Sequence, residues 1–350
     1  MNEVNGSYNI SIHPTRINYY YIPFQRKSNQ QNHATTNQEA CDMADGTFTY
    51  RNSVSSPVPE QFRDNTTHGK ISKIAERKIT RAIDYLVYLA QPKRLPHTKH
   101  GKGLSFRLNF VTLTLSSQQI HSDNEIRAHI FRPFLMALNR NWKVNNYIWR
   151  TERQANGNLH FHIVTDRFIP WNELRNVWNR CQQNLGYVSR YRENQILWHR
   201  EGFRIHQELL PVWPAAQQRK AYRDGVLHDW NNPNSTDVHS IKLITDVKAY
   251  FKKYMTKSGQ NSDIEGRLWG CSSQLSQISG AQTAIYSRID DDLSKIQSDQ
   301  SVKVYQSDYF TIILITILQL SKLGCTELLL IWDEFIISRF PEYRPPTLAL

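Results

Sequence analysis

The triplet His160-Phe161-His162 lies within a segment whose residue pattern predicts a β-strand. Side chains two residues apart lie on the same face of a strand, roughly 6.7 Å apart along the backbone. Two imidazoles at this spacing can bind one divalent ion, while Phe161 points the opposite way into the core. The triplet alone is weak evidence, because such histidine pairs more often lie on a solvated strand face.

Glu152 lies on the preceding predicted strand, across the segment Ala155-Asn156-Gly157-Asn158. An Asn-Gly pair between two strand-like runs predicts a hairpin. A two-residue turn at the Asn-Gly pair would place Glu152 opposite Phe161, away from the histidines. A three-residue loop over Asn156–Asn158 with a bulge would place it opposite His162, and the metal site needs this second register.

Glu152 would complete a set of one carboxylate and two imidazoles. This set suits Mg²⁺ or Mn²⁺ and leaves positions open for phosphate and water. The alternative is that Glu152 serves only as a surface ion-pair partner of Arg150 or Arg153.

Tyr250 and Tyr254 are four residues apart in a segment that predicts a helix over residues 246–257. At this spacing the two side chains point the same way, with Cβ atoms about 5–6 Å apart. Lys253 and Lys257 each follow a tyrosine by three residues. A nearby ammonium group stabilises a phenolate, which otherwise forms near pH 10, and it can also bind phosphate. The alternative is an amphipathic helix with a solvated lysine face.

The charge balance predicts a polyanionic partner. The formal net charge is +12, and binding to phosphates releases their condensed counterions. A basic surface kept for solubility is the alternative, but the charge is clustered. One run without acidic residues carries Lys93, Arg94, Lys99, Lys102 and Arg107, and a second carries Lys248, Lys252, Lys253 and Lys257. The candidate DNA-binding residues are Lys99, Lys102, Arg107, Thr112, Thr114, Lys248 and Lys252.

The chain has three regions by pattern and composition. Residues 1–68 form a polar arm, part of which is expected to be disordered. Residues 69–275 form the main domain, with an aromatic and polar insertion over residues 190–234. Residues 276–350 form an apolar, helical unit of unknown role. Within the main domain, hydrophobic periodicity predicts helices over 71–90, 123–142 and 171–185 and strands over 106–115, 147–153, 159–165 and 238–244.

Cysteine usage and hydropathy exclude several classes of protein. The four cysteines include no Cys-x-x-Cys pair, which excludes a zinc ribbon and fits a reducing cytoplasm. No apolar signal core occurs near Met1. The most apolar stretch, residues 310–320, is too short to span a bilayer. We therefore expect a cytoplasmic protein without a membrane partner.

Three motifs in order resemble those of a known family. The strand Phe110–Leu115, the triplet His160-Phe161-His162 and the two-tyrosine segment Tyr250–Lys257 are similar to the three motifs of HUH endonucleases that initiate rolling-circle replication. The Tyr-x-x-Lys-Tyr-x-x-Lys and Glu-x4-Gly-x2-His-x-His patterns resemble those of microvirus A proteins. Residues 234–239 and 266–270 also look like family sequence, without an assignable chemistry. The resemblance covers about residues 70–275.

The resemblance implies a ferredoxin-like or RRM-like antiparallel sheet with helices, flanked by extensions. In this family, His160, His162 and Glu152 would bind Mg²⁺ or Mn²⁺, which polarises the scissile phosphate. One of Tyr250 and Tyr254 would attack single-stranded DNA at a replication origin, giving a 5′-phosphotyrosine and a free 3′-hydroxyl. The other tyrosine would cleave after one round and allow the first strand to be rejoined.

The resemblance also implies partners in a host bacterial cell. No GxxxxGK[ST] phosphate loop occurs in these 350 residues. Strand separation is therefore expected to need a host helicase, and synthesis a host DNA polymerase.

Two other functions remain open from the sequence. An HUH transposase or relaxase uses the same chemistry, although transposases of this type often use one tyrosine and relaxases often carry more histidines. A non-catalytic module that stacks single-stranded bases on a basic, aromatic sheet would explain the charge but leaves the histidines and lysines unexplained.

Overall fold

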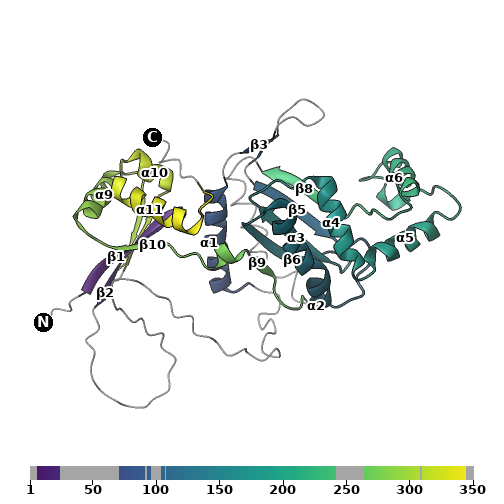
Figure 1. Ribbon diagram of the computed structural model, residues 1–350, viewed down its shortest axis with the longest axis horizontal. Coiled ribbons are helices and arrows are strands. Elements are labelled where there is room, and N and C mark those ends of the chain that lie inside the picture. Colours follow the sequence, from purple (N-terminus) through teal and green to yellow (C-terminus); the bar gives the residue numbers. More distant parts are fainter. Residues whose placement is uncertain are drawn as a thin grey trace, which may run out of the picture. The chain divides into compact units, whose positions relative to one another are not determined.

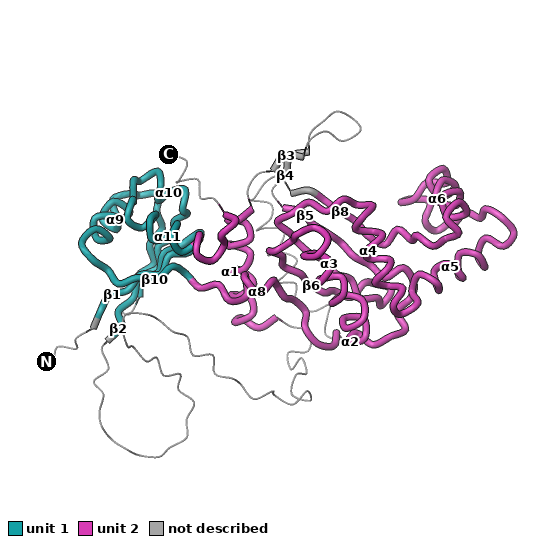
Figure 2. The backbone as a smooth tube through the Cα atoms, in the orientation of Figure 1, with its two compact units in different colours: residues 1–64, 280–335, 349–350 teal, residues 65–279, 336–348 magenta. Residues whose placement is uncertain are grey.

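The computed structural model describes residues 6–23, 71–90, 93–95, 104–106, 108–241, 264–307 and 310–343. The chain divides into two compact units, coloured teal and magenta in Figure 2. Unit 1 comprises residues 1–64, 280–335 and 349–350, and unit 2 comprises residues 65–279 and 336–348. Within the described ranges, no helix is long and apolar enough to cross a membrane.

Unit 2 contains a five-stranded antiparallel sheet with the order β8-β5-β7-β6-β9 (Figure 1). Its strands are β5 (Leu108–Thr114), β6 (Tyr147–Arg153), β7 (Leu159–Thr165), β8 (Thr236–Ile241) and β9 (Trp269–Cys271). With the intervening helices, the first four strands follow the β-α-β-β-α-β order of ferredoxin-like folds. The predicted α+β class with an antiparallel sheet is confirmed. A separate two-stranded sheet pairs β3 (Lys93–Leu95) with β4 (Leu104–Phe106).

Helices cover one face of this sheet and bury its main core. These are α2 (Asp123–Ile126), a π-helical turn η2 (Arg127–Phe131), α3 (Arg132–Trp142) and α4 (Trp171–Gln183). Pro133 has no backbone N–H to donate, and the π turn lies just before it. Alternate strand residues on this face, among them Val111, Leu113 and Phe161, are wholly buried against the helices.

The second face of the sheet is buried at one end and accessible at the other. Helix α1 (Lys73–Leu89) contacts β6 and the short helix α8 (Ser273–Ser276). The hydroxyl of Tyr85 donates to the carbonyl of Ser279 at 2.7 Å and ties α1 to the segment after α8. On the strands, Ile148 and Val164 are 0 % exposed, whereas His160 and Glu152 lie further along the same face and are partly exposed.

The insertion folds into two helices joined by an aromatic stack. The helices are α5 (Tyr187–Trp198) and α6 (Ala215–Leu227), with the short 3-10 turn η3 (Gln207–Leu209) between them. The rings of His199 and Trp230 stack at 5.1 Å. A Cβ on Gly225 would lie 2.0 Å from the Trp230 ring, so only glycine allows this close approach.

Unit 1 contains a second five-stranded antiparallel sheet, in the order β10-β1-β2-β12-β11. Its strands are β1 (Gly6–His13), β2 (Arg16–Pro23), β10 (Ala281–Ala284), β11 (Lys303–Gln306) and β12 (Phe310–Leu314). Helix α9 (Ser287–Ser298) lies between β10 and β11 in the chain, and α10 (Ile317–Lys322) and α11 (Thr326–Arg339) follow β12.

The structure of residues 6–23 differs from the polar arm that the composition predicts. Strand β1 pairs along its length with β2 and also with β10. Tyr8, Ile10 and Ile12 alternate with Ser and Asn residues, and Ile10 and Ile12 are 0 % exposed. This two-residue period is typical of a strand with one buried face. The polar segment thus becomes ordered through strands that follow it in the chain by more than 250 residues.

Candidate functional site

The β6–β7 hairpin places Glu152 directly opposite His160. The backbone N–H of Gln154 donates to the carbonyl of Asn158 at 2.9 Å. The loop is therefore Ala155–Gly157, and the predicted register, with Glu152 opposite His162, is wrong by two residues. Because a shift of two residues preserves the face of every side chain, Glu152 still shares a face with both histidines.

Phe161 fixes the direction of the two histidines, as predicted. Its side chain is 0 % exposed and stacks on the ring of Phe131 at 4.0 Å. Successive residues of a strand point to opposite faces, so the burial of Phe161 directs His160 and His162 to the other side of the sheet. Their ring centroids lie 4.4 Å apart.

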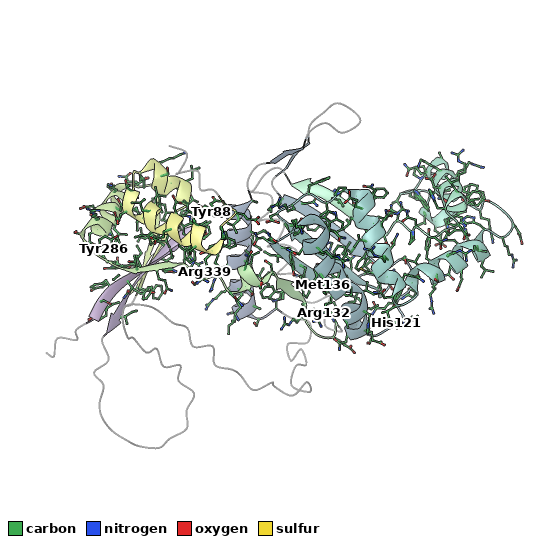
Figure 3. All side chains as sticks on the ribbon, in the orientation of Figure 1. Tyr88, His121, Arg132, Met136, Tyr286 and Arg339 are labelled. Atoms are coloured by element: carbon green, nitrogen blue, oxygen red, sulfur yellow. The ribbon has the colours of Figure 1, made fainter. Side chains whose placement is uncertain are left out.

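The segment after β5 anchors the hairpin loop. The amide of Gln118 donates to the carbonyl of Asn156 at 2.9 Å, and the side-chain oxygen of Asn158 accepts from the N–H of Gln119 at 2.8 Å. His121, labelled in Figure 3, follows these glutamines and lies 3.1 Å from the hydroxyl of Tyr187 through Nδ1. These contacts come from outside the hairpin and stabilise the observed register.

The carboxylate of Glu152 contacts two basic groups. Its Oε2 lies 3.3 Å from Nε2 of His162, and its Oε1 lies 3.4 Å from Nε of Arg150. Burial raises the pKa of Glu152, but the hydrogen bond from His162 and the charges of His162, Arg150 and His160 outweigh it, so the pKa is lowered overall. The alternative role as a partner of Arg150 thus holds alongside the contact with His162, whereas Arg153 binds Asp123 at 2.8 Å.

His162 is held from both neighbouring strands. Its Nδ1 lies 3.3 Å from the hydroxyl of Thr112 on β5, and its ring lies 5.3 Å from the ring of Phe110. Thr114 is opposite His160 in the register, and its hydroxyl donates to the carbonyl of Ser235 at 3.1 Å. Thr112 and Thr114 therefore share the face of the histidines, while their predicted DNA contacts stay predictions.

His160 has a buried nitrogen available to a ligand. Its Nδ1 is buried and has no hydrogen-bond partner among the described residues. Burial, together with the charge of His162, lowers the pKa of His160 to about 4, although Glu152 raises it in part. The imidazole is therefore neutral near pH 7, which is the form that binds metal ions.

These residues fit a divalent cation by donor chemistry, although Glu152 and His162 are bonded to each other. In the described part of the chain, no three His, Cys, Asp or Glu side chains are arranged to hold a metal ion as they stand. Glu152 and His162 would have to exchange their mutual contact for bonds to a cation. The two imidazoles, one carboxylate and the unpartnered Nδ1 of His160 are the groups that could do so.

The structure thus brings five of the predicted site residues to one face of three neighbouring strands. These are Thr112, Thr114, Glu152, His160 and His162. The other predicted residues lie outside the described residues: Tyr250, Tyr254, Lys253, Lys257, Lys99, Lys102, Arg107, Lys248 and Lys252.

Two further features of this face do not emerge from the sequence reasoning. Arg150 is 2 % exposed and adjoins Glu152. On β8, Asp237 is opposite Thr112, and its carboxylate lies 2.7 Å from Nε2 of the exposed His239. The spacing of Asp237 and His239 places both on one strand face, which is the signal that could have indicated them.

The comparison with known protein families matches the part of the chain that carries this face. Residues 108–259 match the family model of the replication-associated protein ORF2. The match covers less than half of the chain and includes all five residues named above, but none of the described residues of unit 1. No curated protein and no solved structure matches the chain. The family match supports a role as a rolling-circle replication initiator.

Proposed function

We propose that the protein starts rolling-circle replication by nicking single-stranded DNA at an origin, with the tyrosine chemistry of HUH endonucleases. The observation that carries the proposal is the placement of Glu152, His160 and His162 on one face of the β6–β7 hairpin, with Glu152 3.3 Å from His162. The hairpin lies within the stretch that matches the replication-associated family.

The proposed metal ligands are Glu152, His160 and His162. The neutral His160 offers an unpartnered nitrogen, and Glu152 has a lowered pKa and stays ionised near pH 7. A Mg²⁺ or Mn²⁺ ion held there would polarise the scissile phosphate. Thr112 would orient His162 through the contact with Nδ1, in the way that outer hydrogen bonds orient metal-binding imidazoles.

The proposed nucleophiles are Tyr250 and Tyr254, which follow β8 in the chain. The tyrosine oxygen attacks the phosphorus, and the bond from phosphorus to the 3′ oxygen breaks. The phenol proton passes through a base to the departing 3′ oxygen, which leaves as a hydroxyl. The product is a 5′-phosphotyrosine. Lys253 and Lys257 would stabilise the phenolate and bind the phosphate.

A denaturing gel tests this proposal directly. The full chain is incubated with end-labelled single-stranded DNA carrying the origin and with Mn²⁺, and we expect a covalent adduct that EDTA abolishes. The double variant Tyr250→Phe with Tyr254→Phe should form none, whereas the matched control Tyr286→Phe in unit 1 should form adduct normally. Adduct retained in the double variant would refute the assignment of the tyrosines, and binding without any adduct would favour a non-catalytic module.

A circular template separates initiation from the related reactions. An initiator with host helicase and polymerase should give repeated strand displacement from one nick, because the free 3′-hydroxyl primes synthesis. A transposase would excise and join ends, and a relaxase would transfer one strand without such repeated synthesis.

A further inference from the structure

The sheet of unit 1 has two faces with different chemistry. Residues opposite one another in antiparallel strands share a face, so the register defines each face. One face, called here the isoleucine face, carries Ile10, Ile12, Ile17 and Ile313. The other, called here the open face, carries Asn9, Asn18, Tyr20, Gln282, Ala284, Lys303, Tyr305, Phe310, Ile312 and Leu314, with Ser7, Ser11, His13, Arg16 and Ile22 along β1 and β2.

The isoleucine face forms part of the core of unit 1. Its four isoleucines are at most 2 % exposed. The helices of this unit contribute buried apolar side chains as well, including Ile289, Leu320 and Trp332 at 0 % exposure. On the open face, by contrast, Tyr305 is 56 % exposed, Phe310 48 % and Leu314 41 %. These values hold in the whole chain, so the side chains are accessible to a ligand.

The open face carries aromatic side chains on neighbouring strands. Phe310 on β12 is directly opposite Tyr20 on β2. Tyr305 on β11 is opposite Ile312, two residues from Phe310 along β12. Cross-strand neighbours lie about 5 Å apart and diagonal neighbours about 7–8 Å apart. This arrangement provides successive aromatic rings on one sheet, as in sheets that stack single-stranded bases.

The charges of unit 1 are separated between the open face and the helices. Among the described positions of the open face, Arg16 and Lys303 are basic and none is acidic. The acidic side chains of the described part of unit 1 instead lie on the helices or in the loop after α9: Asp290, Asp291, Asp292, Asp299, Glu327, Asp333 and Glu334. An apolar face for protein contact needs no such separation, whereas a phosphate backbone favours it.

We propose that the open face of unit 1 is a second binding surface for single-stranded DNA, separate from the histidine face of unit 2. Bases stack on Phe310 and Tyr305, and Lys303 and Arg16 neutralise phosphates. The surface is independent of sequence, because stacking uses the ring faces of the bases rather than their edges. It would hold a displaced or template strand while unit 2 acts on the origin, and this role rests on the proposed function.

Photo-crosslinking locates the bound strand on the intact chain. The full chain is irradiated with an oligo-dT of about 30 nucleotides, long enough for a typical single-strand site, that contains 5-iododeoxyuridine. EDTA is present so that no cleavage occurs, and crosslinked peptides are mapped by mass spectrometry. We expect crosslinks at Tyr305 or Phe310. Crosslinks confined to unit 2 overturn the proposal. The adduct assay with metal is measured separately, so failure of the open face and failure of the nicking chemistry are distinguishable.

Variants matched for exposure test the energetic contribution of the open face. Tyr305→Ala and Phe310→Ala should each weaken binding of oligo-dT about fivefold or more. Leu318→Ala and Leu330→Ala, at side chains on α10 and α11 that are 67 % and 56 % exposed, should leave the affinity unchanged. Equal affinity in all four variants overturns the proposal. So does a loss of self-association in Phe310→Ala at unchanged DNA affinity, because the face then binds a second copy of the chain.

Discussion

Nε2 of His162 lies 3.3 Å from Oε2 of Glu152, across the hairpin of β6 and β7. The other carboxylate oxygen lies 3.4 Å from Nε of Arg150, a side chain that is 2 % exposed. Glu152 is therefore held by two groups before any ligand arrives. A cation bound between these residues would replace the contact with His162 and leave the contact with Arg150 in place.

Glu152→Gln should weaken Mn²⁺ binding about tenfold or more without unfolding the chain. The amide keeps the shape of the side chain and removes the charge that attracts the cation. Isothermal titration of the metal-free protein measures the Kd. The control is Glu201→Gln, at an exposed carboxylate that lies 3.3 Å from the exposed Arg200. An unchanged Kd in Glu152→Gln would mean that Glu152 is an ion-pair residue alone.

Thr112→Val should also weaken Mn²⁺ binding, by about 10- to 100-fold. The substitution removes the hydroxyl that lies 3.3 Å from Nδ1 of His162 and so releases the ring orientation. Thr112→Ser keeps the hydroxyl and should restore the Kd to near its original value. Equal Kd values for the Val and Ser variants would show that the hydroxyl does not position His162.

The metal-free protein should become less stable as the pH falls from about 6.5 to about 4. Burial holds the pKa of His160 at about 4 in the folded state, against an ordinary 6.5. The unfolded chain therefore binds one more proton in this window, and its free energy falls relative to the folded state by up to about 3 kcal/mol. Glu152, whose pKa is also lowered, acts in the same direction.

Urea denaturation in EDTA at about pH 7 and about pH 4.5, on either side of most of this window, measures the loss of stability. His160→Asn cannot take up the proton and should show a smaller decrease in the free energy of unfolding between the two pH values. If the variant loses as much stability as the parent chain, other groups cause the acid sensitivity and the pKa of His160 is not depressed.

The sequence predicts the face of each site residue better than its partner. The alternation around Phe161 follows from a two-residue period, which local chemistry decides, and the structure confirms it. The register of Glu152 depends on Gln118 and Gln119, which bind the hairpin loop from a separate segment. A turn motif cannot predict such contacts, and the predicted loop is therefore displaced by one residue along the chain.

The same limit applies to unit 1, in contrast to the helix start near residue 123. Strand β1 pairs with β10 from the far end of the chain, and no local pattern indicates a partner at that separation. By contrast, the helix begins where the sequence predicts, because Ser122 and Glu125 form a capping box that is encoded within four residues. Local signals thus give the elements, and long-range contacts decide how they assemble.

Gly270→Ala should destabilise unit 2 by about 1–3 kcal/mol. A Cβ at this position would lie 2.7 Å from the ring of Trp149, so either β9 or the tryptophan must move. Trp149 packs edge-on against Phe131 at 5.1 Å, and Phe131 stacks on Phe161, so the displacement would reach the residue between the two histidines. Urea denaturation measures the loss, with the exposed Ser273→Ala as the control that stays within about 0.5 kcal/mol of the parent chain. Equal stability of the two variants would show that β9 can leave Trp149 without cost.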